Sequence, residues 1–494
     1  MKKWLALIMS VLMILSIMGC STPVKETATP AENTEAEFQL EVEGFQVGFS
    51  RKICNPTAPL PLQGFGNVER RYFTEILDDM TFTCVAISDG EGNHILWITH
   101  DLIQSNWNFA YAIMQAISTK TGIPESNIFI SACHSHAVPS EGGGKLNPEA
   151  AAEFKAGCIE AIINASLEAL ADRKPAEMYI GSVETENLNF VRHYYHITED
   201  GEKLYFGDNF GTRVINATTQ HATEVDETMH LLKFTREGDK DVICVNWRAH
   251  PHYTGGSTKT QLSPDYPASF RDALERQTGA HVAYYQGASG NVNSFSRIPS
   301  EIRTSDNRAG GAMMAEHALE GLKNNMTKVD TGTIQVKHMD FYGEINHSMD
   351  HLYSQAQIVQ TVWTSTASWT ECGPYMYDYG IRSPYQANAI VKNYSRTTEK
   401  DGLIRLNVVA IGDDFAFATY PGELFDILSV QMEEASPYAT TMLVGYSAGH
   451  VGYLPAAIAY EYTSYETDVT RFVQGTGEMV RDEYIRMLNE LYGA

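Results

Sequence analysis

Cysteine and basic side chains are both scarce in this chain of 494 residues. It has 7 cysteines, and no two of them stand in a CxxC spacing, so a disulfide framework is not expected, with a single bridge left as an alternative. Cys84, Cys133 and Cys244 lie inside apolar runs and are most simply buried free thiols. With 36 Lys and Arg against 61 Asp and Glu, the net charge is -25. Because such a surface repels polyanions, nucleic acid is not expected as a partner, nor is charge-driven adhesion to anionic lipid.

Long apolar stretches are also rare, and the clearest one lies at the N-terminus. Lys2 and Lys3 precede an apolar stretch from Trp4 to Met18, and Gly19-Cys20 follows it. The stretch is too short to span a membrane comfortably and resembles a bacterial lipoprotein signal over residues 1–20, in which Cys20 becomes the lipidated first residue. An ordinary secretory signal or an uncleaved anchor is the alternative. All versions predict an exported protein, and the lipoprotein version anchors it to the extracytoplasmic face of the cell membrane.

The residues after Cys20 divide into a short tether and a long folded part. Residues 21–37 contain no large aromatic side chain and no apolar pattern, which is typical of a flexible linker. Residues 38–494 are long enough for one large domain or two ordinary ones, and we interpret them as a single domain. The apolar share of 43% and the 26 tyrosines are typical of a globular protein with a large core.

Apolar runs and helical spacings alternate along this folded part, which predicts an α/β fold with a mixed central sheet flanked by helices. The expected strands cover 81–88, 94–99, 127–133, 241–247, 281–286, 406–411 and 415–419. The expected helices cover 106–121, 147–171, 266–278, 309–324 and 470–492. Residues 345–398 are expected to be less regular and are unusually aromatic. That segment forms either extra packing or a lid or wall of a substrate site.

Two His-x-His clusters are the most informative feature of the chain. His134-Ser135-His136 and His250-Pro251-His252 each follow an apolar run that is expected to be a buried strand. In a strand, residues two apart point to the same face, so each cluster would present two imidazoles in one direction. Neutral imidazole is the commonest protein ligand of zinc, and α/β enzymes build their sites at strand ends. The pattern therefore predicts a metal site at the strand ends and a metal-dependent hydrolase.

Further motifs along the chain are similar to those of a known family. In chain order they are Ser131–His136 (SACHSH), Asn187–Arg192 (NLNFVR), Asn246–Pro251 (NWRAHP), Ser263–Pro267 (SPDYP), Gly287–Gly290 (GASG), Pro421–Glu423 (PGE) and Gly452–Glu466, which keeps tyrosines at 453 and 465. Together they resemble the landmarks of the N-terminal catalytic domain of the neutral/alkaline ceramidase family. The resemblance runs from about Val47 to Leu491, nearly the whole expected exported body.

The resemblance implies a function and a set of site residues. It implies an amide hydrolase that uses one zinc ion per chain and acts on ceramide or another N-acyl lipid. The implied zinc ligands are His134, His250, Glu423 and Tyr453. His136 would lie beside the zinc-activated water and exchange protons with it, and Arg192 and Tyr465 would face the scissile carbonyl.

Several departures from the family pattern limit the substrate that can be expected. Gly290–Asn293 reads Gly-Asn-Val-Asn where ceramidases have Gly-Asp-Val-Ser, and Ala137–Pro139 replaces the usual Ser-Gly-Pro. His252 has no family counterpart and is expected in a loop or behind the ligands. The family's C-terminal immunoglobulin-like domain is expected to be absent.

Two alternatives to a lipid amidase stay open. One is a hydrolase of a non-lipid amide or ester, and the other is a lipoprotein that binds a small molecule or lipid without turning it over. The second does not predict a complete set of metal ligands.

Overall fold

The computed structural model describes residues 39–65, 71–143, 145–208, 219–254, 259–294, 307–462 and 464–492. The chain divides into Met1–Glu37 and Phe38–Ala494, and only the second unit contains described residues. The expected signal, Cys20 and the tether therefore lie outside the described residues. Within the described ranges, no helix is both long enough and apolar enough to cross a membrane.

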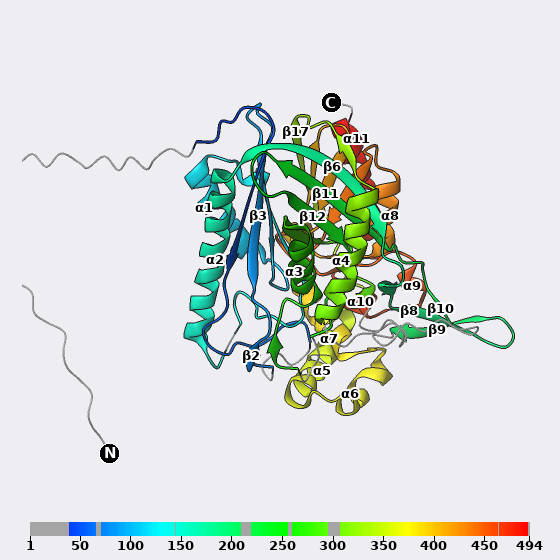
Figure 1. Cartoon of the computed structure of the whole chain (residues 1–494). Helices are drawn as coiled ribbons and strands as arrows, with labels where there is room; N and C mark the ends of the chain where they lie inside the picture. The colour runs from blue at the N-terminus through cyan, green and yellow to red at the C-terminus, as the bar shows by residue number, and fades with distance from the viewer. Residues whose placement is uncertain are drawn as a thin grey trace, which may run out of the picture. The chain divides into compact units, whose positions relative to one another are not determined.

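A nine-stranded mixed sheet forms the centre of this unit (Figure 1). Its strand order is β14-β12-β11-β6-β1-β3-β4-β5, and β16 also pairs with β6. The strands are β1 (Gln46–Ile53), β3 (Thr81–Ser88), β4 (His94–His100), β5 (Ile128–Ala132), β6 (Lys174–Glu184), β11 (Thr228–Arg236), β12 (Val242–Trp247), β14 (His281–Gln286) and β16 (Thr327–Val329). β4 pairs with β5, and β12 with β14, in parallel, while the other pairs are antiparallel.

A second sheet packs against one face of the first. It consists of β17 (Ile334–Tyr342), β18 (Leu403–Ile411), β19 (Phe415–Thr419) and β21 (Thr440–Val444), in that order. The Trp97 ring stacks on Tyr285 at 3.9 Å and on Phe417 at 4.2 Å, so an aromatic layer fills the space between the sheets. Strands β4, β5, β12 and β19 are buried along their whole length, which explains why their sequences are mostly apolar and do not alternate with polar residues.

Helices cover the two outer faces. On the larger sheet, α1 (Trp107–Thr121) and α2 (Pro148–Ala171) share a core with β3 to β5, and α3 (Tyr266–Thr278) and α4 (Asn307–Asn324) share one with β11 to β14. On the smaller sheet, α8 (Asp426–Glu434) and α11 (Thr476–Tyr492) pack on the outer side. The layers are helix, sheet, sheet and helix, which confirms the predicted α/β class with a mixed central sheet.

A bend in β6 brings the two halves of the larger sheet together at one end. β6 pairs with β1 through only two residue pairs and then arches over toward β11, as Figure 1 shows. Two hydrogen bonds join β4 in one half of the sheet to β14 in the other. Thr99 Oγ1 donates to Tyr284 O at 2.8 Å, and Tyr285 OH donates to Trp97 O at 3.0 Å. The segments that follow β5 and β12 consequently meet, and the ring centroids of His134 and His250 are 5.0 Å apart.

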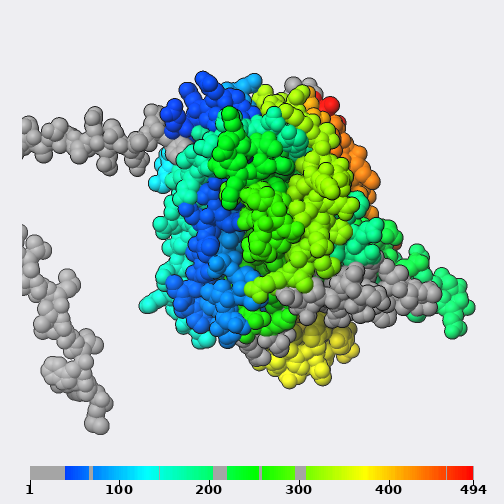
Figure 2. All heavy atoms as spheres, in the orientation of Figure 1, coloured from blue at the N-terminus to red at the C-terminus, as the bar shows by residue number. Residues whose placement is uncertain are grey.

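The structure corrects the expectation of irregular structure for residues 345–398. This segment contains α5 (Tyr353–Thr366), α6 (Trp369–Met376) and α7 (Pro384–Tyr394), which appear yellow near the lower edge of the face in Figure 2. The Ser368 and Ser383 side chains cap the last two helices by accepting backbone hydrogen bonds, and buried residues such as Val359 form a small separate core. The helices are short and several aromatic side chains face outward, so the apolar period is weak.

The C-terminal helix is also shorter than expected. It begins at Thr476 rather than at residue 470, and Gly475 precedes it with φ of 91°. Residues 470–475 instead lie beside β22 (Tyr453–Leu454), because Thr470 Oγ1 donates to Tyr453 O at 2.9 Å. This hydrogen bond fixes the chain next to one of the expected site residues.

Candidate metal centre

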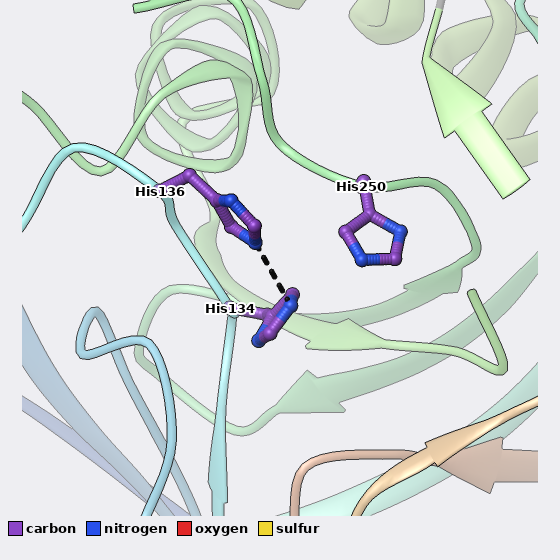
Figure 3. A group of neighbouring side chains, drawn as sticks. All are labelled: His134, His136 and His250. Atoms are coloured by element: carbon purple, nitrogen blue, oxygen red, sulfur yellow. Dashed lines mark hydrogen bonds between the residues drawn. The ribbon is translucent and has the colours of Figure 1, made fainter. Parts of the chain in front are cut away.

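The first histidine cluster lies beyond the end of its strand. β5 ends at Ala132, and His134 has φ of 64°, a left-handed conformation that is unusual for a residue other than glycine. The strand-face argument is therefore wrong for this pair, yet the two imidazoles still meet. His136 Nε2 lies 3.0 Å from His134 Nε2 (Figure 3). The His134 ring also stacks on Tyr446 at 3.9 Å, which holds the turn in place.

His250 joins these two side chains from another part of the fold. Figure 3 shows His134 and His136 on one segment and His250 on a second, with all three rings turned toward one another. One nitrogen from each ring lies within 4.8 Å of the others, and all three residues are buried. Three buried imidazoles that converge in this way are a candidate metal site.

Backbone carbonyls fix the tautomers of the two predicted histidine ligands. His134 Nδ1 lies 2.8 Å from Ile103 O, and His250 Nδ1 lies 3.1 Å from Val292 O. Because a carbonyl oxygen can only accept, each Nδ1 carries the proton and each Nε2 keeps its lone pair, directed into the cluster. Burial lowers the pKa of His134 well below its usual value and that of His250 to about 3. Both rings therefore remain neutral, the form that binds a metal.

Glu423 completes the cluster of nitrogen and oxygen donors. Its Oε2 atom lies 3.2 Å from His250 Nε2 and 3.6 Å from His134 Nε2. Burial raises the pKa of Glu423. Glu423 belongs to β20 (Glu423–Leu424), which pairs in parallel with β22, so that Glu423 is the direct partner of Tyr453. The structure thus brings together all four predicted ligands, and two imidazole nitrogens with carboxylate and phenol oxygens suit zinc.

Arg192 and Tyr465 lie on the Tyr453 side of this cluster. Arg192 follows β7 (Asn189–Val191), and its guanidinium carbon is 5.9 Å from the centre of the Tyr453 ring. Tyr465 is the first residue of α10 (Tyr465–Val469), and its ring centroid is 5.6 Å from that of Tyr453. The His136 ring adjoins those of His134 and His252, with centroids 4.7 and 4.5 Å away. The predicted proton-transfer and carbonyl-facing residues therefore adjoin the predicted ligands.

Glu466 is a buried site residue to which the sequence assigns no role. Its Oε1 accepts from Arg192 Nε at 2.8 Å, and its Oε2 lies 2.9 Å from His193 Nε2. Despite burial, these neighbours hold the pKa of Glu466 well below its usual range. A glutamate in the first turn of a helix is ordinarily an exposed residue, so spacing alone does not distinguish it. In the fold it keeps Arg192 charged and fixed.

Two more side chains near the cluster were not predicted. His450, in the loop before β22, places Nε2 at 3.9 Å from Glu423 Oε1. Tyr446 has φ of 54°, and its hydroxyl lies 2.7 Å from Ser289 Oγ. The glycines around them signal a tight loop but not which side chain faces the site.

The glycine loop after β14 is required for the close approach of its backbone to Glu423. A Cβ atom on Gly290 would lie 2.7 Å from the carbonyl oxygen of Glu423. The Gly290 carbonyl in turn accepts a hydrogen bond from Arg192 Nη2 at 2.8 Å. Gly290 therefore links Glu423 to the arginine through the backbone alone.

Comparisons with solved structures give the same fold. The neutral ceramidase of Pseudomonas aeruginosa superposes with a TM-score of 0.67 and 14% identity, over 92% of this chain and 75% of that one. A ceramidase complexed with C2 gives a TM-score of 0.65 and 14% identity, over 91% and 75% of the two chains. No protein-family profile matches the chain, and no curated protein matches it in sequence. The resemblance seen in the motifs is thus confirmed in three dimensions, and this chain has the fold of neutral ceramidase.

Proposed function

We propose that this protein is a zinc-dependent amidohydrolase that cleaves the amide bond of ceramide or another N-acyl lipid. The convergence of His134 Nε2, His250 Nε2 and Glu423 Oε2 in one buried cluster carries this proposal. The fold supports it as well, because the solved structures that share this fold are ceramidases. A bound zinc ion would supply a Lewis acid and lower the pKa of a water molecule to about 7.

The remaining residues have separate tasks in this proposal. His136 is a neutral, buried imidazole, so it can take a proton from the attacking water and return it to the leaving nitrogen. Arg192 and Tyr465 donate hydrogen bonds to the carbonyl oxygen as negative charge develops on it. Glu466 and the Gly290 carbonyl hold the guanidinium of Arg192 in one orientation, so that little reorganisation is needed during the reaction.

The place of action is part of the same proposal. We expect export and attachment to the extracytoplasmic face of the cell membrane through a lipid on Cys20. The folded body would then meet substrates that are dissolved in, or released from, a membrane. A non-lipid amide or ester, and a binding protein without turnover, are the competing accounts.

The first test is the metal content of the full-length chain, purified in detergent without chelator or added metal. We expect about one zinc per chain, lost in His250→Ala and Glu423→Ala while the far-ultraviolet circular dichroism stays unchanged. His347→Ala is the matched control, because His347 is exposed and contacts Asp350. If both site variants keep their zinc, or the parent takes up none, the binding protein becomes the better account. Release of free amine from N-acyl amides then tests turnover.

A further inference from the structure

Two asparagines in the loop after β14 have different environments. Asn291 Oδ1 accepts a hydrogen bond from the backbone nitrogen of Asp426 at 2.9 Å, so the fold uses this side chain. Asn293 is 1% exposed, and among the described residues neither its Nδ2 nor its Oδ1 atom has a hydrogen-bond partner. A buried polar group left unpaired costs about 1–3 kcal/mol. The Asn293 amide is therefore a cost to the fold, which points to a use outside it.

The position of Asn293 directs this amide toward the metal centre. Asn293 lies in β15 (Val292–Ser294) and forms an isolated parallel bridge with His250. Residues that are paired in this way project their side chains to the same face. β15 also pairs with β7, and Arg192 N donates to Asn291 O at 2.9 Å. Asn293 thus lies between a predicted metal ligand and the segment that carries the oxyanion-binding arginine.

Arg71 supplies a second, independent observation at the same centre. Its three guanidinium nitrogens donate to backbone carbonyls, including that of His136 at 3.1 Å. Within the described ranges no carboxylate forms an ion pair with it, whereas the buried Arg192, Arg248 and Arg271 all have one. Arg71 is itself buried, and burial lowers its pKa to about 10. An uncompensated positive charge therefore adjoins His136 in a strongly acidic protein.

We propose that Asn293 recognises the leaving-amine half of the substrate, and that this half carries a carboxylate or carbonyl on the carbon next to the amide nitrogen. The inference rests on the proposed function and deepens it by naming N-acyl-α-amino acids and their amides as the substrate class. An asparagine side chain offers an acceptor and a donor side by side. The scissile N–H matches the acceptor, and the neighbouring carbonyl oxygen matches the donor. The charge of Arg71 favours a carboxylate at that place over a neutral hydroxyl.

In the motif comparison, ceramidases have a serine where this chain has Asn293. A serine hydroxyl is a single, shorter group. Asparagine extends further into the site and needs a partner with both a donor and an acceptor. The exchange therefore changes the kind of leaving group rather than the chemistry of cleavage.

Non-cleavable ligands test this inference apart from turnover. The probes are dodecylsulfonyl conjugates of glycine, glycinamide and ethanolamine, which keep the N–H but replace the scissile carbonyl with a sulfonyl group. Titration calorimetry on the zinc-loaded full-length chain in detergent should give tightest binding for the glycine conjugate and at least about tenfold weaker binding for the ethanolamine conjugate. Because the sulfonamide is common to all three, their differences report only on the leaving half.

Three substitutions sharpen the comparison. Asn293→Ser should weaken the glycine and glycinamide conjugates about tenfold, the equivalent of one hydrogen bond, and leave the ethanolamine conjugate within about twofold. Asn293→Asp should weaken the glycine conjugate more than the glycinamide conjugate, because two carboxylates repel. Asn291→Ser is the matched control and should keep the order of the parent.

The outcomes separate this inference from the proposed function. If the chain cleaves no acyl amide but binds the probes in an order that depends on Asn293, the proposed function fails and the recognition stands. If cleavage occurs and Asn293→Ser keeps the order of the parent, the recognition is overturned. Tightest binding of the ethanolamine conjugate to the parent overturns it as well.

Discussion

The core between the two sheets is built by close apolar packing, whereas the loops at the end of the same strands hold site residues in strained backbone conformations. In the core, Trp97 is stacked between aromatic rings from β14 and β19, and the surrounding side chains are apolar. At the loop end, His134 and Tyr446 adopt left-handed backbone conformations and stack on each other. Strain of this kind persists only where the surroundings enforce it, and it is concentrated at functional sites. The core therefore stabilises the fold, and part of that stability offsets the backbone strain at the loop end.

Buried charges show the same contrast. Arg271 on α3 binds both carboxylate oxygens of Asp101, at 2.8 and 2.7 Å, and so ties a helix to the end of β4. Beside the candidate metal centre, Arg71 donates to three backbone carbonyls and lies over the Phe65 ring, and it has no carboxylate partner among the described residues. Buried arginines that tie elements of the fold together are paired with carboxylates, whereas among the described residues Arg71 lacks a carboxylate partner and the Asn293 amide lacks any hydrogen-bond partner.

The largest effect on stability is expected in the core. Trp97→Ala should lower the free energy of unfolding by about 3–5 kcal/mol, because it leaves a cavity between two stacked rings. Urea denaturation measures the loss, and the zinc content of the folded protein should not change. The control is Trp369→Ala, since Trp369 is 43% exposed and should change stability by about 0.5 kcal/mol or less. Loss of zinc from folded Trp97→Ala protein would show that the two regions are not separable.

The next largest effect is expected from Glu466→Gln. The substitution leaves the buried Arg192 without a charged partner, and breaking such a pair costs about 3 kcal/mol. We also expect kcat to fall while the zinc content stays at that of the parent, because Arg192 loses its fixed orientation. Glu177→Gln removes an exposed pair with Lys328 and should leave both stability and kcat unchanged. A normal kcat in Glu466→Gln would contradict the role assigned to Arg192.

Continuous apolar runs and clear helix starts explain why most of the fold was predictable. β14 and α3 have the expected bounds, since β14 is buried from its second residue onward and α3 starts directly after Asp265, with Pro267 in its first turn. The helices α5 to α7 were not predicted, because their outward aromatic side chains hide a helical period. Local patterns identify an element when its burial is regular along the sequence and fail when it is not.

From residue spacing alone, the site was predictable only where residues close in sequence act together. The His-x-His motifs located the cluster, and the resemblance supplied Glu423 and Tyr453. The partnership of Arg192 with Glu466 spans 274 residues and depends on the bend in β6 and on the loops after β22. The spacing of apolar residues along the sequence does not indicate such a contact. The role proposed for Asn293 could not be predicted from the sequence either. That its amide has no hydrogen-bond partner among the described residues is seen only in the folded structure.

A smaller effect for each residue is expected from pH on the chelated protein. Burial depresses the folded-state pKa of His134, His136 and His250 below 6.5, so the unfolded chain binds protons first as pH falls. Their contribution is complete above about pH 6.5 and is lost toward lower pH, by about 1.4 kcal/mol per pH unit for each histidine. Urea denaturation at pH 7, 6 and 5 with EDTA present should show this slope, and His250→Gln should reduce it by one histidine. Equal slopes in parent and variant would mean that His250 is not held neutral.

The smallest effect is expected where the helices α5 to α7 meet the loop end. Tyr385 on α7 makes an edge-to-face contact with Tyr465 at 5.5 Å, and such pairs are worth about 1 kcal/mol. If these helices form a wall of the substrate site, Tyr385→Leu should raise KM for N-acyl substrates about threefold and leave kcat within about twofold, with zinc content unchanged. Tyr379→Leu is the control, because Tyr379 is exposed in the short turn between α6 and α7. An unchanged KM with a lowered melting temperature would instead assign Tyr385 to the packing that stabilises the fold.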